Sequence, residues 1–417
     1  MSSGLPSTRR SVAVVGAAQV ANVASAMAMV VALARCLDVP TVASAAWFLG
    51  LVAVVGPLST AGGSAGMVPL VARARLDRAV VDAVVRRSLP TIALGGLVAW
   101  AAVQWWAPSN TLWAWLAVPW VVVGGLAGLV EAAARAAGQL WIAAVANDWP
   151  RRLAVAVGVL LGAGSSPADR LNRALLLAAL LQGLVLAAGW VALRRRMPHR
   201  GESSAPRMWS FAVAQLIGLT VPQAGVLFVG TGGDAAAAAD YGVAVRLSMV
   251  FTLVAAVSAR AAAPRVAAAP DLVAIEPWLR RVATVSTLCV AFPLAGLALA
   301  GRWGLAAALG AEYRSAYPAA VLLGAMVLTT VGTGLSGLCL MNRGRARVLA
   351  GTSSVATLCF LGAAAVAGRL GGATAVAATA LAVIAIYGVV LAQVARRLLG
   401  VNVWPSLRRK AVSEGRC

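Results

Sequence analysis

Charged residues are scarce in this sequence, and the residue types that most often build catalytic and metal sites are scarcer still. Only 12% of the 417 residues are charged, 13 residues are acidic, and His199 is the single histidine. One histidine excludes a histidine-rich metal site and the HExxH motif. The single lysine, Lys410, rules out a glycine-rich phosphate loop that ends in Lys-Ser or Lys-Thr. The sequence therefore predicts a protein that is not an enzyme or an ATP-driven pump, with no catalytic residue, no metal and no cofactor.

Cysteine is also rare. The five cysteines are Cys36, Cys289, Cys339, Cys359 and Cys417, and they are widely scattered, without a CxxC pair. An odd, scattered set fits neither a disulfide framework nor metal-ligand spacing. We interpret them as small apolar residues within or beside hydrophobic segments.

Apolar residues, by contrast, are abundant: 61% of the chain is hydrophobic and the mean hydropathy is +0.86. Apolar runs of about 20 residues, the length that crosses a bilayer core of about 30 Å, recur along the sequence. Lipid cannot satisfy open backbone groups, so each run is predicted to be a helix. We predict an all-α integral membrane protein with about twelve transmembrane helices. The predicted spans are 11–34, 43–66, 89–107, 112–130, 140–163, 174–193, 211–230, 242–263, 282–300, 317–341, 348–367 and 373–394.

The net charge of +22 is unevenly divided between the loops. With these spans, 26 positive residues fall on one side of the membrane and 6 on the other, and three lie within spans. Positive residues concentrate in cytoplasmic loops. The imbalance therefore predicts a multi-pass protein of the cell (cytoplasmic) membrane with both termini in the cytoplasm. No nucleic-acid-binding module accompanies the charge, so we expect no nucleic-acid partner.

The two halves of the chain are weakly alike. The Ala-Gln pair that ends at Gln19 recurs at Gln215, 196 positions later, and Asp38 recurs with the same offset at Asp234. Two six-span units in the same orientation would be related by a pseudo-twofold axis along the membrane normal, with substrate bound between the two lobes. We predict an N-terminal six-helix lobe at 1–197, a cytoplasmic linker at 198–210, a C-terminal six-helix lobe at 211–395 and a basic cytoplasmic tail at 396–417.

A few ionisable residues lie inside the apolar spans, where a charge is costly and implies a function or a partner. Asp148, Arg151 and Arg152 are three and four residues apart, so they can share one helical face. Arg246 lies in the span 242–263. We predict that Arg246 and at least one of the other two arginines face a central cavity. Alternatively, Arg151 and Arg152 extend to the cytoplasmic surface.

An arginine-lined cavity attracts anions, and the planar guanidinium matches phosphate in a bidentate manner. We therefore predict that Arg246, Arg151 and Arg152 bind an anionic headgroup, with Arg35 at an outer cavity mouth or simply at the outer interface. Each glutamine or asparagine in the spans could instead form an interhelical hydrogen bond. The polar residues predicted in the cavity are Gln19, Asn22, Asp148, Gln215, Gln223 and Tyr241.

Short stretches of the sequence resemble polysaccharide flippases, the O-antigen and exopolysaccharide lipid-carrier exporters of the multidrug/oligosaccharidyl-lipid/polysaccharide superfamily. The similar stretches are Asp240-Tyr241 to Arg246-Leu247, Leu309-Gly310 to Ala316, Leu340 to Arg345, and Gly371-Gly372 to Ala375. The family's usual phenylalanine before the glycine is replaced here by Leu309.

The resemblance implies alternating-access transport of an undecaprenyl-diphosphate-linked oligosaccharide to the outer leaflet, for the biosynthesis of cell-surface polysaccharide. It implies the lipid-linked glycan and membrane lipids as partners, and a polysaccharide polymerase or glycosyltransferase complex as a further one. Two alternatives stay open. A drug or cation antiporter of the same superfamily would need carboxylates in its spans, whereas a membrane-embedded glycosyltransferase or ligase would need acidic residues and large outer loops.

Overall fold

The fold is helical throughout the part of the chain that the structure describes. This structure is a computed structural model, in which the described residues are 8–64, 66–67, 78–107, 111–162, 165–197, 209–231 and 234–405. The first half forms α1 (Thr8–Cys36), α2 (Val39–Ser59), α4 (Arg78–Trp106), α5 (Thr111–Ala136), α6 (Leu140–Ala146), α7 (Trp149–Leu161) and α8 (Pro167–Arg196). The second half forms α9 (Trp209–Thr231), α10 (Ala235–Ala268), α11 (Glu276–Leu309), the short 3-10 helix η1 (Ala311–Ser315), α12 (Ala316–Asn342) and α13 (Ala346–Leu399).

Nine helices of the described residues are long and apolar enough to cross a membrane. That number includes α13 once and leaves out α9 and the short pair α6 and α7. The helix α13 has 54 residues, which would extend about 80 Å if straight and so far exceed a bilayer core. It consists instead of two helices that join at Gly372 and fold back on each other. The 3.0 Å distance between Ser353 Oγ and Tyr387 Oη shows that the two helices lie side by side. With α13 counted as two helices and with α9 and the α6–α7 pair added, the described residues match the predicted twelve spans.

One predicted span differs from the expectation of a continuous helix. The segment 140–163 is interrupted at Asn147 and Asp148, so that α6 and α7 are separate helices. Asn147 is extended, and Pro150 occupies the first turn of α7, where a missing N–H costs nothing. The break lies within the predicted span, about a third of the way along it, rather than at one of its ends.

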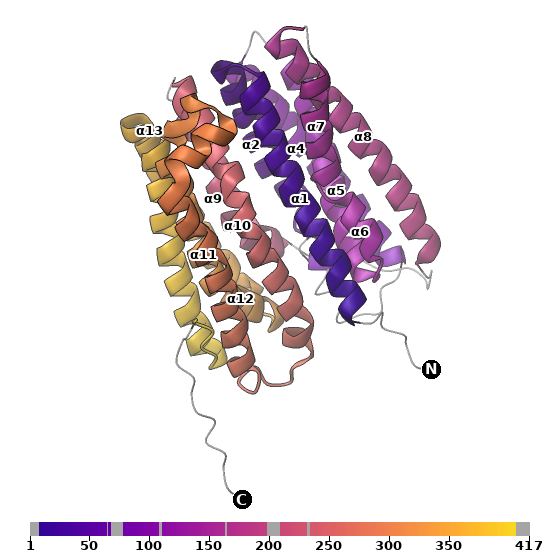
Figure 1. Ribbon diagram of the computed structural model, residues 1–417. Helices are drawn as coiled ribbons and strands as arrows, with labels where there is room; N and C mark the ends of the chain where they lie inside the picture. Colours follow the sequence, from indigo (N-terminus) through magenta and orange to yellow (C-terminus); the bar gives the residue numbers. More distant parts are fainter. Residues whose placement is uncertain are drawn as a thin grey trace, which may run out of the picture.

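The helices form two lobes that lie side by side, the N-lobe (α1 to α8) and the C-lobe (α9 to α13) (Figure 1). The same spans contact each other in both lobes: α1 packs on α7 as α9 packs on α13, and α2 packs on α4 and α5 as α10 packs on α11 and α12. This repetition agrees with two six-helix units related by a pseudo-twofold axis. The start of α1 and the end of α13 lie at the same end of the bundle, as an even number of spans requires (Figure 1).

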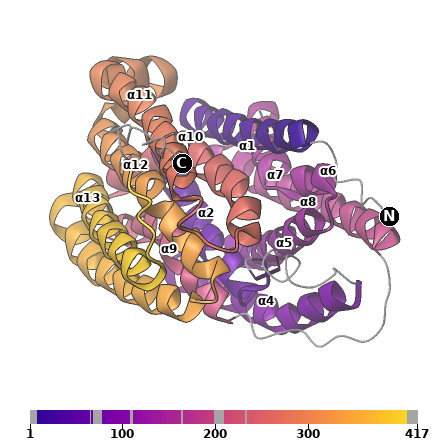
Figure 2. The same ribbon diagram turned by 90° about the horizontal axis from the view of Figure 1, so that it is seen from below.

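The lobes touch through α2, which packs on α9 and α10, and through α1, which packs on α10 and α11 (Figure 2). Small residues make the α2 contact close. A Cβ atom added to Gly242 would lie 2.3 Å from Ala46 Cβ, and one added to Gly50 would lie 3.2 Å from Gln223 O. Ala46 lies near the start of α2 and Gly242 near the start of α10. The close contact therefore lies toward the end of the bundle opposite the start of α1.

The chain continues past α13 into a segment that packs on the C-lobe. Val401 and Val403 are buried in a cluster with residues of α10, α11 and α12. Arg280 Nε donates a 2.7 Å hydrogen bond to Asn402 O. The helix extends to Leu399, beyond the predicted start of the tail at 396, while residues 406–417 and most of the predicted linker (198–208) lie outside the described residues.

The turn inside α13 generates a prediction, because Gly372 has φ 57° and ψ −145°, a region that is essentially restricted to glycine. We expect Gly372→Ala to lower stability by about 1–3 kcal/mol, observed as a lower unfolding temperature of the purified protein in detergent. Gly362→Ala is the matched control, since Gly362 lies in the same helix with nothing within 4 Å of an added Cβ. Equal melting of the two variants would contradict a conformational requirement at Gly372.

Candidate substrate cavity

A cavity of about 420 Å³ lies between the two lobes. Its wall takes residues from α1, α2, α5 and the α6–α7 pair on the N-lobe side, and from α9, α10, α12 and α13 on the C-lobe side. Arg246 lies about 16 Å along α10 from its start, and Thr330 about 21 Å along α12. Both helices start at the end where the lobes are in close contact. The cavity therefore lies on the far side of that contact, toward the end where α1 starts.

A charged cluster at the start of α7 forms one end of the cavity. Arg151 Nη2 is 2.8 Å from Asp148 Oδ1, and Arg152 Nη2 is 3.6 Å from Asp148 Oδ2. The predicted spacing thus places both guanidinium groups on one carboxylate, because Asp148 precedes the first turn of α7 and both arginines lie in that turn. Arg151 and Arg152 line the cavity rather than extending to the membrane surface.

The break between α6 and α7 exposes backbone groups that lipid could not satisfy. Gln182 Nε2, on α8, lies 3.2 Å from Ala146 O and 3.3 Å from Asn147 O, and donates to both. The indole Nε1 of Trp149 donates to Ala144 O at 2.9 Å. These side chains stabilise an irregular backbone at membrane depth and so fix the position of Asp148.

Arg151 and Arg152 each have a further partner besides Asp148. The Arg151 guanidinium lies over the Trp120 ring, 4.5 Å from its centroid. Arg152 Nη1 donates to Asn22 Oδ1 on α1 at 3.1 Å. These contacts link α1, α5 and α7 around the charged cluster.

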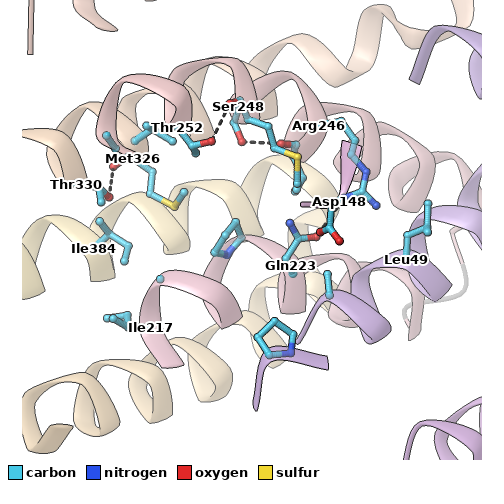
Figure 3. A pocket seen from close by; sticks show the side chains of 18 of the residues that line it. Leu49, Asp148, Ile217, Gln223, Arg246, Ser248, Thr252, Met326, Thr330 and Ile384 are labelled. Atoms are coloured by element: carbon cyan, nitrogen blue, oxygen red, sulfur yellow. Dashed lines mark hydrogen bonds between the residues drawn. The ribbon is translucent and has the colours of Figure 1, made fainter. Parts of the chain in front are cut away.

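Arg246 belongs to the C-lobe but faces the same space. Its side chain is 8% exposed, and its Nη1 donates a long 3.4 Å hydrogen bond to Gln223 Oε1. Figure 3 shows Arg246, Gln223 and Asp148 directed toward one another. Among the described lining residues, three guanidinium groups face one carboxylate, so the cavity carries a net charge of plus two.

Not every predicted residue lies in this cavity. Arg35 donates through Nε to Ala308 O at 3.0 Å and through Nη2 to Ala307 O, so it joins the end of α1 to the end of α11. Tyr241 is fully buried, and its ring lies where a Cβ atom on Gly225 would be. Gln19 is buried on α1 and is not among the lining residues, nor is Asn22, which accepts from Arg152, while the side chain of Gln215 lies outside the described residues. The role of these five residues in binding stays a prediction.

Several lining residues have no feature in the sequence that marks them as part of a site. Trp120 resembles any other interfacial tryptophan, and hydroxyl residues are common in membrane helices. The additional lining residues include Trp120, Ser248, Met249, Thr252, Met326, Thr330 and Thr333. Within the described chain, no group of three or more histidine, cysteine, aspartate or glutamate residues could hold a metal ion.

No family model and no curated protein sequence matches this chain. Its fold does match solved transporters. An inward-facing multidrug resistance MATE family transporter of the MOP superfamily gives a TM-score of 0.61 at 13% identity, over 92% of this chain and 94% of that one. An outward-facing MATE structure gives 0.55 at 13% identity, over 94% and 95%. A MOP superfamily transporter from Pyrococcus furiosus Vc1 (DSM3638), described as having a binding pocket of reverse polarity, gives 0.58 at 13% identity, over 94% and 95%.

The chain therefore has the fold of a polytopic membrane transporter. More particularly, this is the fold of the MATE transporters in the MOP superfamily.

The position of Arg35 generates a prediction about the contact between the lobes. We expect Arg35→Ala to loosen the end of the bundle where α1 ends, because two hydrogen bonds to α11 are lost. The neighbouring residue Cys36 should then react about threefold or more faster with a membrane-impermeant maleimide added on that side. The measurement uses a variant in which Cys36 is the sole cysteine. Arg314→Ala is the control, since Arg314 contacts Trp303 of the C-lobe. Unchanged Cys36 labelling would show that Arg35 does not hold the lobes together.

Proposed function

We propose that this protein is a flippase that moves an undecaprenyl-diphosphate-linked oligosaccharide across the cytoplasmic membrane for the biosynthesis of cell-surface polysaccharide. The observation that carries the proposal is the arginine-rich cavity between the lobes. Arg151, Arg152 and Arg246 surround it at membrane depth, and Asp148 balances one of the three charges.

The charge of the cavity fits the headgroup. A diphosphate esterified at both ends carries two negative charges, which equals the net charge of plus two on the lining residues. Arginine suits this ligand because its planar fork donates two parallel hydrogen bonds to a phosphate.

Transport by alternating access follows from the position of the cavity. The lobes are in close contact at one end, and the cavity lies toward the other end, which the loop charges assign to the cytoplasm. The higher TM-score of the inward-facing neighbour compared with the outward-facing one supports this assignment. A lipid-linked glycan would therefore bind from the cytoplasmic leaflet and leave on the outer side after the lobes rock.

A drug or cation antiporter fits the fold equally well, and the composition of the cavity is the observation that favours the flippase. A cation carrier needs a carboxylate that is available to its ligand. Among the described lining residues the carboxylate is Asp148, and both of its oxygens are paired with arginine. The Pyrococcus furiosus neighbour, whose pocket is described as having a reverse polarity that suggests a different function, is consistent with more than one function for this fold.

The first test concerns Arg246. In a strain whose sole copy is the variant, we expect Arg246→Ala to reduce glycan export about tenfold or more at normal protein abundance, because a charge-assisted bond to the diphosphate is lost. Arg246→Lys should restore export in part, since the ammonium keeps the charge but loses the fork. Export is measured as surface glycan, with abundance checked by immunoblot.

The control variant is Arg281→Ala, which removes one exposed arginine of α11 and should leave export unchanged. Normal export by Arg246→Ala at normal abundance would remove Arg246 from the binding site. Accumulation of the lipid-linked glycan on the inner leaflet of the deletion strain would separate a transport defect from a defect in synthesis.

The second test separates the flippase from the cation antiporter. Asp148→Asn removes the carboxylate charge but keeps an oxygen that accepts from Arg151. A flippase for an anion should retain more glycan export in this variant than in Arg246→Ala, because the cavity becomes more positive. A cation antiporter should lose transport completely in Asp148→Asn and not in Arg246→Ala. Unchanged glycan export in both variants, together with loss of cation transport in Asp148→Asn alone, would favour the antiporter.

A further inference from the structure

The C-lobe wall of the cavity differs in chemistry from the charged cluster. Four hydroxyl residues line it along α10 and α12, which we call the hydroxyl wall: Ser248, Thr252, Thr330 and Thr333. Figure 3 shows three of them, Ser248, Thr252 and Thr330, at increasing distance from the end of the cavity that holds Arg246 and Asp148. The cavity is therefore cationic at one end and lined by neutral polar groups at the other.

Each of these hydroxyl groups donates a hydrogen bond to a backbone carbonyl oxygen of its own helix. Ser248 donates to Val245 O at 2.7 Å and Thr252 donates to Met249 O at 2.7 Å. Thr330 donates to Met326 O at 3.0 Å and Thr333 to Thr329 O at 2.9 Å. A hydroxyl oxygen keeps acceptor capacity after its proton is used. The hydroxyl wall therefore offers acceptors, whereas the guanidinium groups offer donors.

We propose that the hydroxyl wall is the subsite for the first sugar of the lipid-linked glycan, whose hydroxyl groups donate to it. This inference rests on the proposed function and adds to it the place and chemistry of sugar recognition. The order of the groups along α10 fits such a ligand. Ser248 is two residues after Arg246 and Thr252 is six, about 9 Å along the helix axis. A sugar bonded directly to a diphosphate held by Arg246 would lie beside these hydroxyls.

A hydrocarbon chain is the competing occupant, since Met326 and Ile384 also line this part of the cavity. Hydrocarbon would leave the acceptor oxygens without donors, which disfavours it relative to a sugar. A sugar uses both components, because its hydroxyl groups donate to the oxygens while its C–H faces contact the apolar side chains. The two occupants respond in opposite directions when a hydroxyl is replaced by a methyl group.

The experiment measures binding to the full-length protein in detergent with two ligands that differ by one sugar and carry the same two negative charges. One is undecaprenyl diphosphate capped as a methyl ester, which serves as the bare lipid diphosphate, and the other is undecaprenyl diphosphate that carries a single N-acetylglucosamine. We expect the wild-type protein to bind the sugar-bearing ligand more tightly. The double variant Thr252→Val with Thr330→Val should lose about tenfold in affinity for that ligand and nothing for the bare lipid diphosphate.

Thr329→Val is a closely matched control. Thr329 donates to the same carbonyl as Thr330, Met326 O, at 2.7 Å, but does not line the cavity. We expect this variant to bind both ligands as the wild type does.

Three outcomes would overturn the assignment: equal weakening of both ligands in the double variant, tighter or unchanged binding of the sugar-bearing ligand, and no preference for the sugar in the wild type. Failure of the proposed function itself is recognised separately. In that case the wild type would bind the bare lipid diphosphate no better than Arg246→Ala does, a comparison that involves no hydroxyl residue.

Discussion

The need to stabilise guanidinium charge at membrane depth is the constraint on which this architecture depends. Two arginines share the Asp148 carboxylate, and that carboxylate is held where α6 stops and α7 starts. The break is stable because Gln182 of α8 donates hydrogen bonds to the carbonyl oxygens of Ala146 and Asn147, which lack a helical N–H partner there. Asn22 of α1 and Trp120 of α5 complete the surroundings of the two arginines. Four spans of the N-lobe are thus arranged around one charged cluster, which the C-lobe meets with Arg246.

Most of the fold was predictable from the sequence, because lipid imposes a simple rule on composition. Apolar length gave the spans, the loop arginines gave the arrangement in which both termini share a side, and Gly371–Gly372 lay where two spans were expected to meet. The break at Asn147 and Asp148 was missed, since hydropathy averaged over the span 140–163 hides four polar residues among twenty others. The close contact of Gly242 with Ala46 also depends on the packing of distant segments, which no local pattern records.

The candidate site was predictable only where burial is expensive. Arg246, Arg151 and Arg152 stand out because charge in lipid demands an explanation, and all three line the cavity. Arg35 lies at the end of a helix, where the free-energy cost of placing a charge is small. The sequence therefore could not tell whether its side chain faces the cavity or the neighbouring lobe. Threonine and serine carry no such signal, because a hydroxyl group can donate a hydrogen bond to a carbonyl of its own helix whether the side chain points to a cavity, to lipid or to another helix. The hydroxyl wall therefore became visible only when α10 and α12 were placed beside each other.

The small residues between the lobes have a consequence for the energetics of movement. Association within lipid gains little from the hydrophobic effect and depends on close packing. The close contacts of Gly50, Gly242 and Ala46 between the lobes are van der Waals contacts. These residues have no polar side chains, so separating them breaks no side-chain hydrogen bond of their own. Such a contact can open and close again without a large desolvation barrier. Two arrangements of the lobes that differ mainly in such contacts would lie close in free energy, so that the binding or release of one ligand in the cavity would be enough to shift the balance between them.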